Sequence, residues 1–167
     1  MEMLTAGQLP LRVTHNDTKS NNVLFDRESK KPITVIDLDT VMPGLVAFDF
    51  GDAIRSAANT ANEDEADLSK VSLDTEKFKA FAEGFLEATA GMLTDAELDS
   101  LVLGAFTLTF EQAVRFLDDY LTGDKYFRTA YEGHNLVRAK CQYTLAEDIL
   151  NKMDKLDEII ENTTRLF

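Results

Sequence analysis

The chain has 167 residues, of which 44% are hydrophobic and 28% are charged, values typical of one globular domain with a sizeable core. Its 17 Lys and Arg residues and 30 Asp and Glu residues give a net charge of −13, which argues against nucleic acid and anionic membranes as partners. The amino-terminal stretch lacks the pattern of a signal peptide and no segment reaches transmembrane length, so we expect a cytoplasmic protein.

The first third of the chain predicts short β-strands that alternate with polar loops. The β-prone runs cover residues 11–14, 22–25 and 33–37. The polar turn between the last two contains Pro32, which limits any strand before it, so these runs predict an antiparallel hairpin. Asn22 and Asp37 would lie close together at the two ends of this hairpin. Residues 42–44 (M-P-G) are expected to form a loop.

The remainder of the chain predicts helices, because its apolar residues recur at helical spacing. The predicted helices cover residues 48–58, 74–90, 94–121 and 135–162. Thr94 and Glu97 have the spacing of a capping box at the start of the third helix, and Gly123 follows its end. That helix is apolar on most sides and should lie buried at the centre, whereas the acidic stretch 59–70 predicts a surface loop. We therefore predict a mostly helical α+β fold that forms a single domain over residues 1–167.

The polar loop before the predicted hairpin carries residue types that suit phosphoryl transfer. They follow the pattern H-x-D-x-K-x-x-N, in His15, Asp17, Lys19 and Asn22. This reaction needs a hydroxyl held in line, Mg²⁺ on the phosphates of ATP and a carboxylate near the attacking oxygen. We predict that Asp17 orients the hydroxyl and accepts its proton, and that Lys19 reaches the transferred phosphate. Asn22 and Asp37 offer the oxygen ligands that Mg²⁺ prefers.

Two further residues are expected to support this loop. His15 should organise it through hydrogen bonds. Residues 49–51 spell D-F-G, the metal-binding tripeptide of protein kinases, but they do not follow a β-prone run. Asp37 does end such a run, so we predict that it is the metal ligand. Asp49 is expected to cap the helix behind the site and to brace the loop.

The order of these motifs resembles the carboxyl-terminal lobe of the aminoglycoside phosphotransferase and choline kinase superfamily, whose signature is H-x-D-x-x-x-x-N followed by an I-D-x-D strand end. Nearly the whole chain is similar to bacterial N-acetylhexosamine 1-kinases, through T-H-N-D-T-K-S-N-N-V-L-F-D, V-I-D-L-D-T-V-M-P-G, F-D-F-G-D-A-I-R, R-F-L-D-D-Y-L-T-G-D-K-Y-F and G-H-N-L. The resemblance implies a protein-kinase-like lobe whose small hairpin carries the catalytic loop and the metal-binding aspartate. It also implies an amino sugar, an N-acetylhexosamine, as the acceptor of a phosphate on its anomeric hydroxyl. The sugar pocket would be lined by Asp39, Arg115 and Tyr126.

Some features weigh against parts of this resemblance. The superfamily's amino-terminal lobe supplies a glycine-containing loop, a lysine for the phosphates and the hinge for adenine, and none of these can be placed ahead of Thr14. We therefore expect this chain to be the catalytic and acceptor lobe, and to be inactive in isolation. Taken alone, Arg115 also fits a surface or ion-paired arginine, and Tyr126 fits ordinary loop packing.

Two other functions compete with a kinase. Residues 37–41 (D-L-D-T-V) fit the nucleophile motif of haloacid-dehalogenase-type phosphatases, but that fold needs a parallel sheet to continue after the motif, and the chain instead predicts helices. The other alternative is a lobe that binds without catalysis, such as a pseudokinase or an interaction module. The intact set of polar loop residues argues against it, whereas the lack of a nucleotide lobe favours it.

Overall fold

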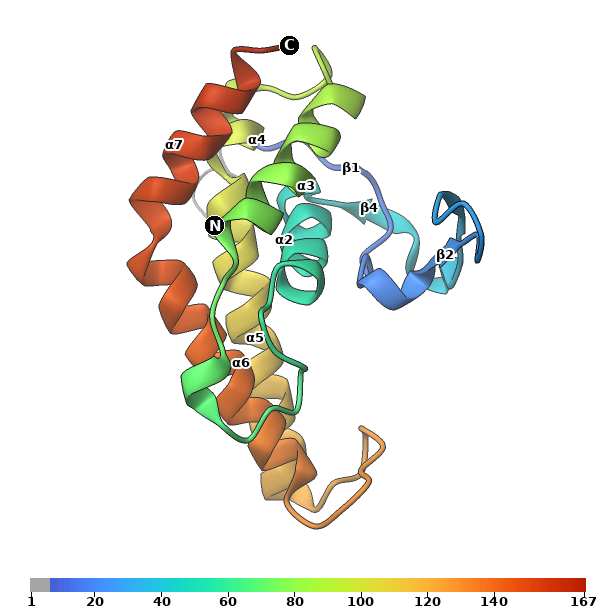
Figure 1. The fold of residues 1–167 in the computed structure, drawn as a ribbon, viewed down its shortest axis with the longest axis vertical. Helices are drawn as coiled ribbons and strands as arrows, with labels where there is room; N and C mark the ends of the chain where they lie inside the picture. The colour runs from blue at the N-terminus through green and yellow to red at the C-terminus, as the bar shows by residue number, and fades with distance from the viewer. Residues whose placement is uncertain (1–6) are drawn as a thin grey trace.

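The computed structural model describes residues 7–167, and Figure 1 shows a body of helices from which a small β region projects on one side. The strands are β1 (Arg12–Thr14), β2 (Val23–Phe25), β3 (Pro32–Val35) and β4 (Met42–Gly44). The α-helices are α2 (Val46–Ala57), α3 (Thr75–Ala88), α4 (Asp95–Asp99), α5 (Leu101–Thr122), α6 (His134–Asn151) and α7 (Met153–Thr164). Three short 3-10 helices are η1 (Ser20–Asn22), η2 (Leu38–Thr40) and η3 (Leu68–Lys70). The mostly helical α+β architecture expected from the sequence is confirmed.

The β region consists of two separate antiparallel pairs of strands. Strand β2 pairs with β3, which confirms the predicted hairpin. Strand β1 pairs with β4, so the prediction of a loop at residues 42–44 was wrong. Gly44 makes this pairing possible, because a methyl group added there would lie 2.8 Å from Asn16 Oδ1 and closer still to Thr14 Oγ1. The strand is thus set by its partner β1 and not by its own β-propensity, which is low for M-P-G.

Helix α5 lies at the centre of the helical body, packed between α2 and α6 (Figure 1). The largest buried apolar side chains come from several helices, and include Phe50, Ile54, Phe78, Leu101, Leu145, Ile149 and Leu156. The prediction that α5 is buried on most sides was wrong for one face, on which Phe110, Val114 and Leu121 are exposed. Within residues 7–167 no helix is both long enough and apolar enough to cross a membrane.

Two predicted long helices are each broken once. Ser100 separates α4 from α5, and its hydroxyl donates to the carbonyl of Glu97 at 2.7 Å, a local bond that competes with regular helical geometry. Lys152 separates α6 from α7, and its ammonium group donates to the carbonyl of Leu73 at 2.9 Å and to Asp148 Oδ2. The second break lets α7 turn and pack against α3. The apolar pattern contains no sign of the polar bonds that accompany the two breaks.

The predicted capping box is confirmed and has a further partner. Thr94 and Glu97 exchange the two hydrogen bonds of this motif at the start of α4. The carboxylate of Glu97 is buried and also accepts two hydrogen bonds from the Arg12 guanidinium, at 2.7 and 2.8 Å. Strand β1 is therefore tied to the helical body by a bidentate ion pair.

Helices α2 and α5 cross with their backbones in contact. A methyl group added at Gly51 would lie 2.8 Å from the backbone nitrogen of Ala105 and closer to the carbonyl of Gly104. A methyl group at Gly104 would in turn meet the backbone and side chain of Ala47. Only glycine at both positions permits this approach, so the pair fixes the distance between the two helices.

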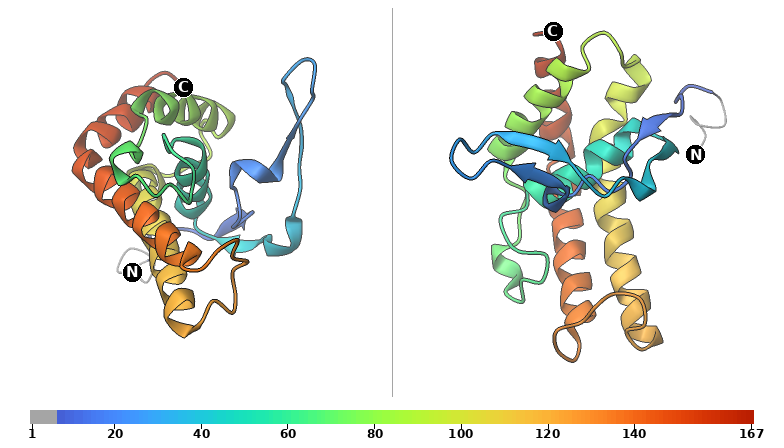
Figure 2. Two further views of the ribbon diagram at one scale, coloured as in Figure 1. Left: turned by 60° about the horizontal axis from the view of Figure 1, so that its bottom comes forward. Right: turned by 90° about the vertical axis from the view of Figure 1, so that its right-hand side faces the viewer.

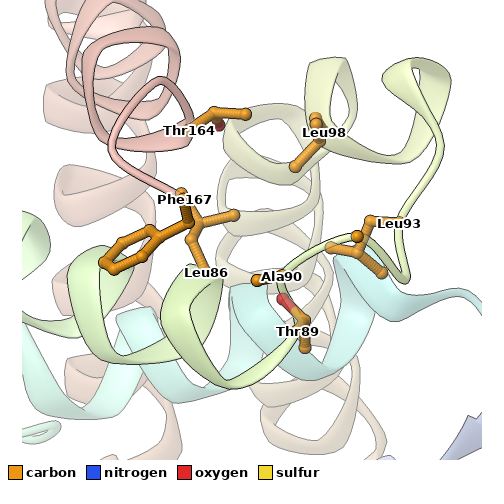
Figure 3. A pocket seen from close by; sticks show the side chains of 8 residues that line it. Leu86, Thr89, Ala90, Leu93, Leu98, Thr164 and Phe167 are labelled. Atoms are coloured by element: carbon orange, nitrogen blue, oxygen red, sulfur yellow. The ribbon is translucent and has the colours of Figure 1, made fainter.

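A small apolar pocket lies where α3, α4 and α7 end (Figure 3). It is lined by residues that include Leu86, Leu93, Leu98, Thr164 and Phe167, and its volume is about 70 Å³. This space is too small for a substrate and carries no ionisable side chain, so the functional site must be sought elsewhere.

The glycine contact predicts unequal effects of adding one methyl group. Gly51→Ala and Gly104→Ala should each lower the free energy of unfolding by about 1–3 kcal/mol, because the helices must move apart. Gly84→Ala is the control, because Gly84 lies in α3 with open space around its Cβ position. It should stabilise the chain by about 0.5–1 kcal/mol through helix propensity. Urea denaturation measures all three, and equal effects at the three positions would contradict a backbone contact.

Candidate functional site

Asp17, Lys19 and Asn22 converge in the loop between β1 and β2. The Lys19 ammonium group and the Asn22 amide nitrogen both donate to Asp17 Oδ2, each at 2.8 Å. The same amide nitrogen donates to the Asp17 carbonyl, also at 2.8 Å. Asn22 is buried and uses its nitrogen on Asp17, so the amide oxygen is the atom left for a cation. This orientation is the one required of a metal ligand.

Asp17 is ionised in this arrangement. Its partial burial is the largest influence and favours the neutral acid, but the hydrogen bonds from Lys19 and Asn22 outweigh burial and lower the pKa of Asp17 below its ordinary value. The hydrogen bond to Asp17 raises the pKa of Lys19, and the nearby carboxylates of Asp37 and Asp52 act in the same direction. At neutral pH the loop therefore presents a carboxylate that can accept a proton beside an ammonium group that can bind a phosphate oxygen.

Asp37 follows strand β3 and lies at the open end of the hairpin, where Asn22 precedes β2, as the sequence predicted. The backbone nitrogen of Ile36 donates to the carbonyl of Asn22 at 2.9 Å, which brings the residue before Asp37 against η1. Asp37 itself has a φ of +65°, a conformation that non-glycine residues seldom adopt and that is often found at functional sites. His15 lies alongside, with its Nε2 atom 3.0 Å from the carbonyl of Ile36.

Asn22 and Asp37 are the residues that could hold a magnesium ion together with a nucleotide. Among residues 7–167 no three His, Cys, Asp or Glu side chains converge into a metal cluster of their own. Asn22 and Asp37 would supply one amide oxygen and one carboxylate, and Mg²⁺ in such sites takes its other ligands from phosphate oxygens and water.

Helix α2 holds the loop in place through Asp49. The two carboxylate oxygens of Asp49 accept hydrogen bonds from the backbone nitrogens of His15 and Asn16, at 2.8 and 2.7 Å. Thr18 adds a hydrogen bond from its hydroxyl to the Asp49 carbonyl. The expectation that Asp49 caps the helix was wrong, because the residue at the N-cap is Leu45 and Asp49 lies in the first turn. A carboxylate there is still favourable to the helix, and it leaves both oxygens free to face the loop.

Arg115 and Tyr126 line one open pocket of about 360 Å³ at the far end of α5. The Arg115 guanidinium lies over the rings of Tyr126 and Phe127, at 5.8 and 5.4 Å from their centres. Asp39 does not line this pocket but lies exposed in η2, next to the hairpin. The structure thus brings together two of the three residues predicted for the sugar. The loop between α5 and α6 and the hairpin project on the same side of the helical body (Figure 1).

Asp119 shapes that pocket and was missed in the sequence. Its buried carboxylate accepts hydrogen bonds from the backbone nitrogens of residues 125, 126 and 127, at 2.8–2.9 Å, and from the Asn135 amide at 2.9 Å. Burial favours the neutral acid, but these bonds outweigh it and lower the pKa of Asp119. The sequence did contain one signal. An acidic residue in the last turn of a helix interacts unfavourably with the helix dipole, so Asp119, shortly before Gly123, suggests a separate structural role.

The comparison with protein families agrees with this geometry. Residues 1–89 match the model of the phosphotransferase enzyme family. The matched stretch is more than half of the chain and includes the polar loop, the hairpin and Asp49 on α2.

The role of Asp119 predicts a local effect of removing its charge. Asp119→Asn should release the backbone amides of residues 125–127, because an amide accepts fewer and weaker hydrogen bonds than a carboxylate. NMR spectra should then show these amides shifted toward unstructured positions, while Asp118→Asn, an exposed neighbour, should leave them unchanged.

The same interaction predicts a pH dependence. Because folding lowers the pKa of Asp119, its contribution to stability is complete above the pKa of an unfolded aspartate, about 3.9. It declines as the pH falls below that value and through the lower pKa of the folded state. Amide shifts of residues 125–127 that stay constant in this acidic range would contradict the assignment.

Proposed function

This chain belongs to the phosphotransferase enzyme family, and we propose that it transfers a phosphoryl group from ATP to a hydroxyl group of a small molecule. The observation that supports this most directly is the hydrogen-bonded set of Asp17, Lys19 and Asn22, with Asp37 next to it at the end of the hairpin. A carboxylate, an ammonium group and two oxygen ligands are the groups that phosphoryl transfer requires.

Each residue has a role that follows from its position. Asp17 orients the acceptor hydroxyl and accepts its proton, which its ionised state permits. As Asp17 takes up the hydroxyl proton it loses the charge that holds Lys19, and Lys19 can bind an oxygen of the transferred phosphoryl group. The acceptor oxygen forms the new bond to phosphorus, and the electrons of the broken P–O bond leave with ADP. Asn22 and Asp37 would hold Mg²⁺, which neutralises charge on the phosphates when bound. His15 and Asp49 keep the loop in this geometry through backbone hydrogen bonds.

We propose an amino sugar, an N-acetylhexosamine, as the acceptor. The proposal rests on the long motifs shared with bacterial N-acetylhexosamine 1-kinases, and Asp39, Arg115 and Tyr126 are the residues assigned to the sugar on that ground. The shared pocket of Arg115 and Tyr126 is compatible with such an acceptor.

A phosphatase and a purely binding role have less support. Both sheets in residues 7–167 are antiparallel pairs, whereas the phosphatase fold that shares the D-L-D-T-V motif requires a parallel sheet. A lobe that only binds has no need for Asp17, Lys19 and Asn22 in mutual hydrogen-bond contact.

The β region supports the proposal that a second segment supplies the nucleotide side. Apolar side chains are exposed on every strand and on η2, and Val13, Ile33 and Leu38 have 84%, 65% and 60% of their surface accessible. Exposed apolar surface of this kind marks an interface. We propose that a nucleotide-binding lobe covers it, so that ATP lies between that lobe and the hairpin.

The proposed role of Asp17 is tested in a two-lobe enzyme, in which this chain is joined to a nucleotide-binding lobe of the same family. Asp17→Asn should lower kcat by about 10²–10⁴-fold with little change in KM for the acceptor, because the proton acceptor is lost and the binding groups remain. Asp26→Asn removes a carboxylate from the turn of the same hairpin and should leave kcat unchanged. Turnover near the wild-type level in the Asp17 variant would remove Asp17 from the catalytic role.

The chain by itself should fold but not phosphorylate a sugar. Its helical core should unfold cooperatively, whereas its Mg²⁺ ligands alone should bind Mg-ATP only at millimolar concentrations. Calorimetric titration and an ADP-release assay on the 167-residue chain test this. Micromolar affinity for Mg-ATP, or ADP release above that of Asp17→Asn, would show that no further lobe is needed.

A further inference from the structure

A row of alternating charges connects helix α2 to helix α6. It begins with Asp52 and Arg55 on α2, whose carboxylate and guanidinium groups lie 2.8 Å apart. Arg55 also donates to Glu63 Oε1 at 2.8 Å. Glu63 belongs to the segment that follows α2, which runs beside α6 (Figure 1). Its second oxygen, Oε2, lies 3.9 Å from Nε of Arg138 on α6. Glu63 is therefore shared between two arginines that belong to different helices.

The other end of the Arg138 guanidinium group holds the loop between α5 and α6. Its Nη1 atom donates to the carbonyl of Arg128, in that loop, at 3.1 Å. The guanidinium group also lies over the ring of Phe116, 5.3 Å from its centre. Phe116 packs against Phe127 with ring centres 4.7 Å apart, and Phe127 lines the pocket of about 360 Å³ at the far end of α5. Arg138 therefore supports one wall of this pocket although it does not line it.

The end of Arg138 near Glu63 lacks a hydrogen bond. Its Nε atom is buried and has no hydrogen-bond partner among residues 7–167. Buried donors of this kind are costly and rare in folded proteins. At 3.9 Å the contact with Glu63 is an ion pair but is too long for a hydrogen bond, and an approach of about 1 Å would form one. The Glu63 side chain has room for this approach, because 42% of its surface is accessible.

A guanidinium group transmits a displacement from one end to the other. It is planar and rigid, so the Nε atom near Glu63 cannot move without the Nη1 atom that is bonded to the Arg128 carbonyl. On its other side Glu63 is bonded to Arg55, which is buried in the helical body. Helix α2, which carries Arg55, also holds the polar loop through Asp49. The loop between α5 and α6 is thereby linked to the helix that positions the polar loop.

We propose that Arg138 is a positioning residue for the pocket at the far end of α5, and that Glu63 couples the position of Arg138 to helix α2. The catalytic consequence rests on the proposed function: the coupling keeps an acceptor that contacts this pocket aligned with Asp17. Neither Glu63 nor Arg138 lies among the groups assigned to the reaction. Removing either one should therefore impair the acceptor and leave the affinity for ATP unchanged.

The coupling is tested first without any reaction, in NMR spectra of the 167-residue chain. Glu63→Gln removes the charge that the two arginines share, and we expect it to shift the backbone amides of residues 126–129. Among residues 7–167 Glu63 has no ion pair or hydrogen bond with that loop, so the effect must pass through Arg138. Glu65→Gln is the matched control, because it removes the same charge from a side chain that pairs with Lys70. It should leave these amides unchanged.

The second test uses the two-lobe enzyme and asks whether the two side chains act as a unit. Glu63→Gln and Arg138→Gln should each raise KM for the acceptor by about three- to tenfold, the effect of about one hydrogen bond, with KM for ATP unchanged. The double variant should be no worse than either single variant, because each change breaks the same link. Arg138→Lys should be as impaired as Arg138→Gln, since a lysine lacks the planar group that joins the Arg128 carbonyl to Glu63.

Three results would overturn the inference. They are shifts in Glu63→Gln that stay confined to the segment after α2, multiplied losses in the double variant, and full rescue by Arg138→Lys. The Glu63 side chain is exposed, so Glu63→Gln should fold and keeps the test valid if an Arg138 variant does not. The outcome is distinguishable from failure of the proposed function. Shifted amides at residues 126–129 without turnover in the two-lobe enzyme would refute phosphoryl transfer alone, whereas turnover with independent effects of the two residues would refute the coupling alone.

Discussion

The contact between Gly51 and Gly104 is the constraint on which the rest of the site depends. It lets the backbones of α2 and α5 touch and so fixes where α2 begins relative to the core. Asp49 lies half a turn before Gly51 and points its carboxylate away from that contact, toward the amides of His15 and Asn16. The loop is thus positioned by the packing of two helices that contribute no chemistry. A shift of α2 by the width of one methyl group would move every polar residue of the loop.

The electrostatics of the site follow from pairing and not from net charge. The chain carries a charge of −13, yet each of the two basic residues nearest the loop is held by carboxylates: Lys19 by Asp17, and Arg55 by Asp52 and Glu63. These pairs keep Asp17 ionised and keep Arg55 fixed where an isolated charge would be costly to bury. An anionic nucleotide therefore finds the two cations nearest the loop already engaged by carboxylates. Under the proposed function, the phosphates would therefore depend on Mg²⁺ and on groups outside this loop.

Local patterns predicted much of this fold. The hairpin, the capping box at Thr94 and the helix end at Gly123 depend on residues close together in sequence, and all three are present. Strand β4 could not be predicted, because M-P-G becomes a strand only through its contact with β1. The helix breaks at Ser100 and Lys152 interrupt apolar stripes that continue unchanged across them.

The candidate site likewise has one part that local sequence patterns predicted and another part that they did not. The spacing of Asp17, Lys19 and Asn22 indicated their proximity, since η1 and the hairpin are local structures. The hydrogen bonds of Asp119 to the loop that follows α5 and to Asn135 join segments whose relation is set by tertiary packing. No spacing rule connects these residues, so the role of Asp119 became visible only in three dimensions.

The ion pair between Arg12 and Glu97 has a consequence for motion. It fastens the strand that leads into the polar loop, while Asp49 fastens the loop itself, so the polar loop is attached to the helical body at two points. Among residues 7–167, no ion pair or side-chain hydrogen bond ties the hairpin beyond Asn22 to the helical body, and the hairpin extends away from the helices (Figure 2). The boundary between the firmly held loop and the less constrained hairpin therefore lies at η1. Under the proposed function, an acceptor hydroxyl could keep its register with Asp17 while the hairpin bends to follow a covering lobe.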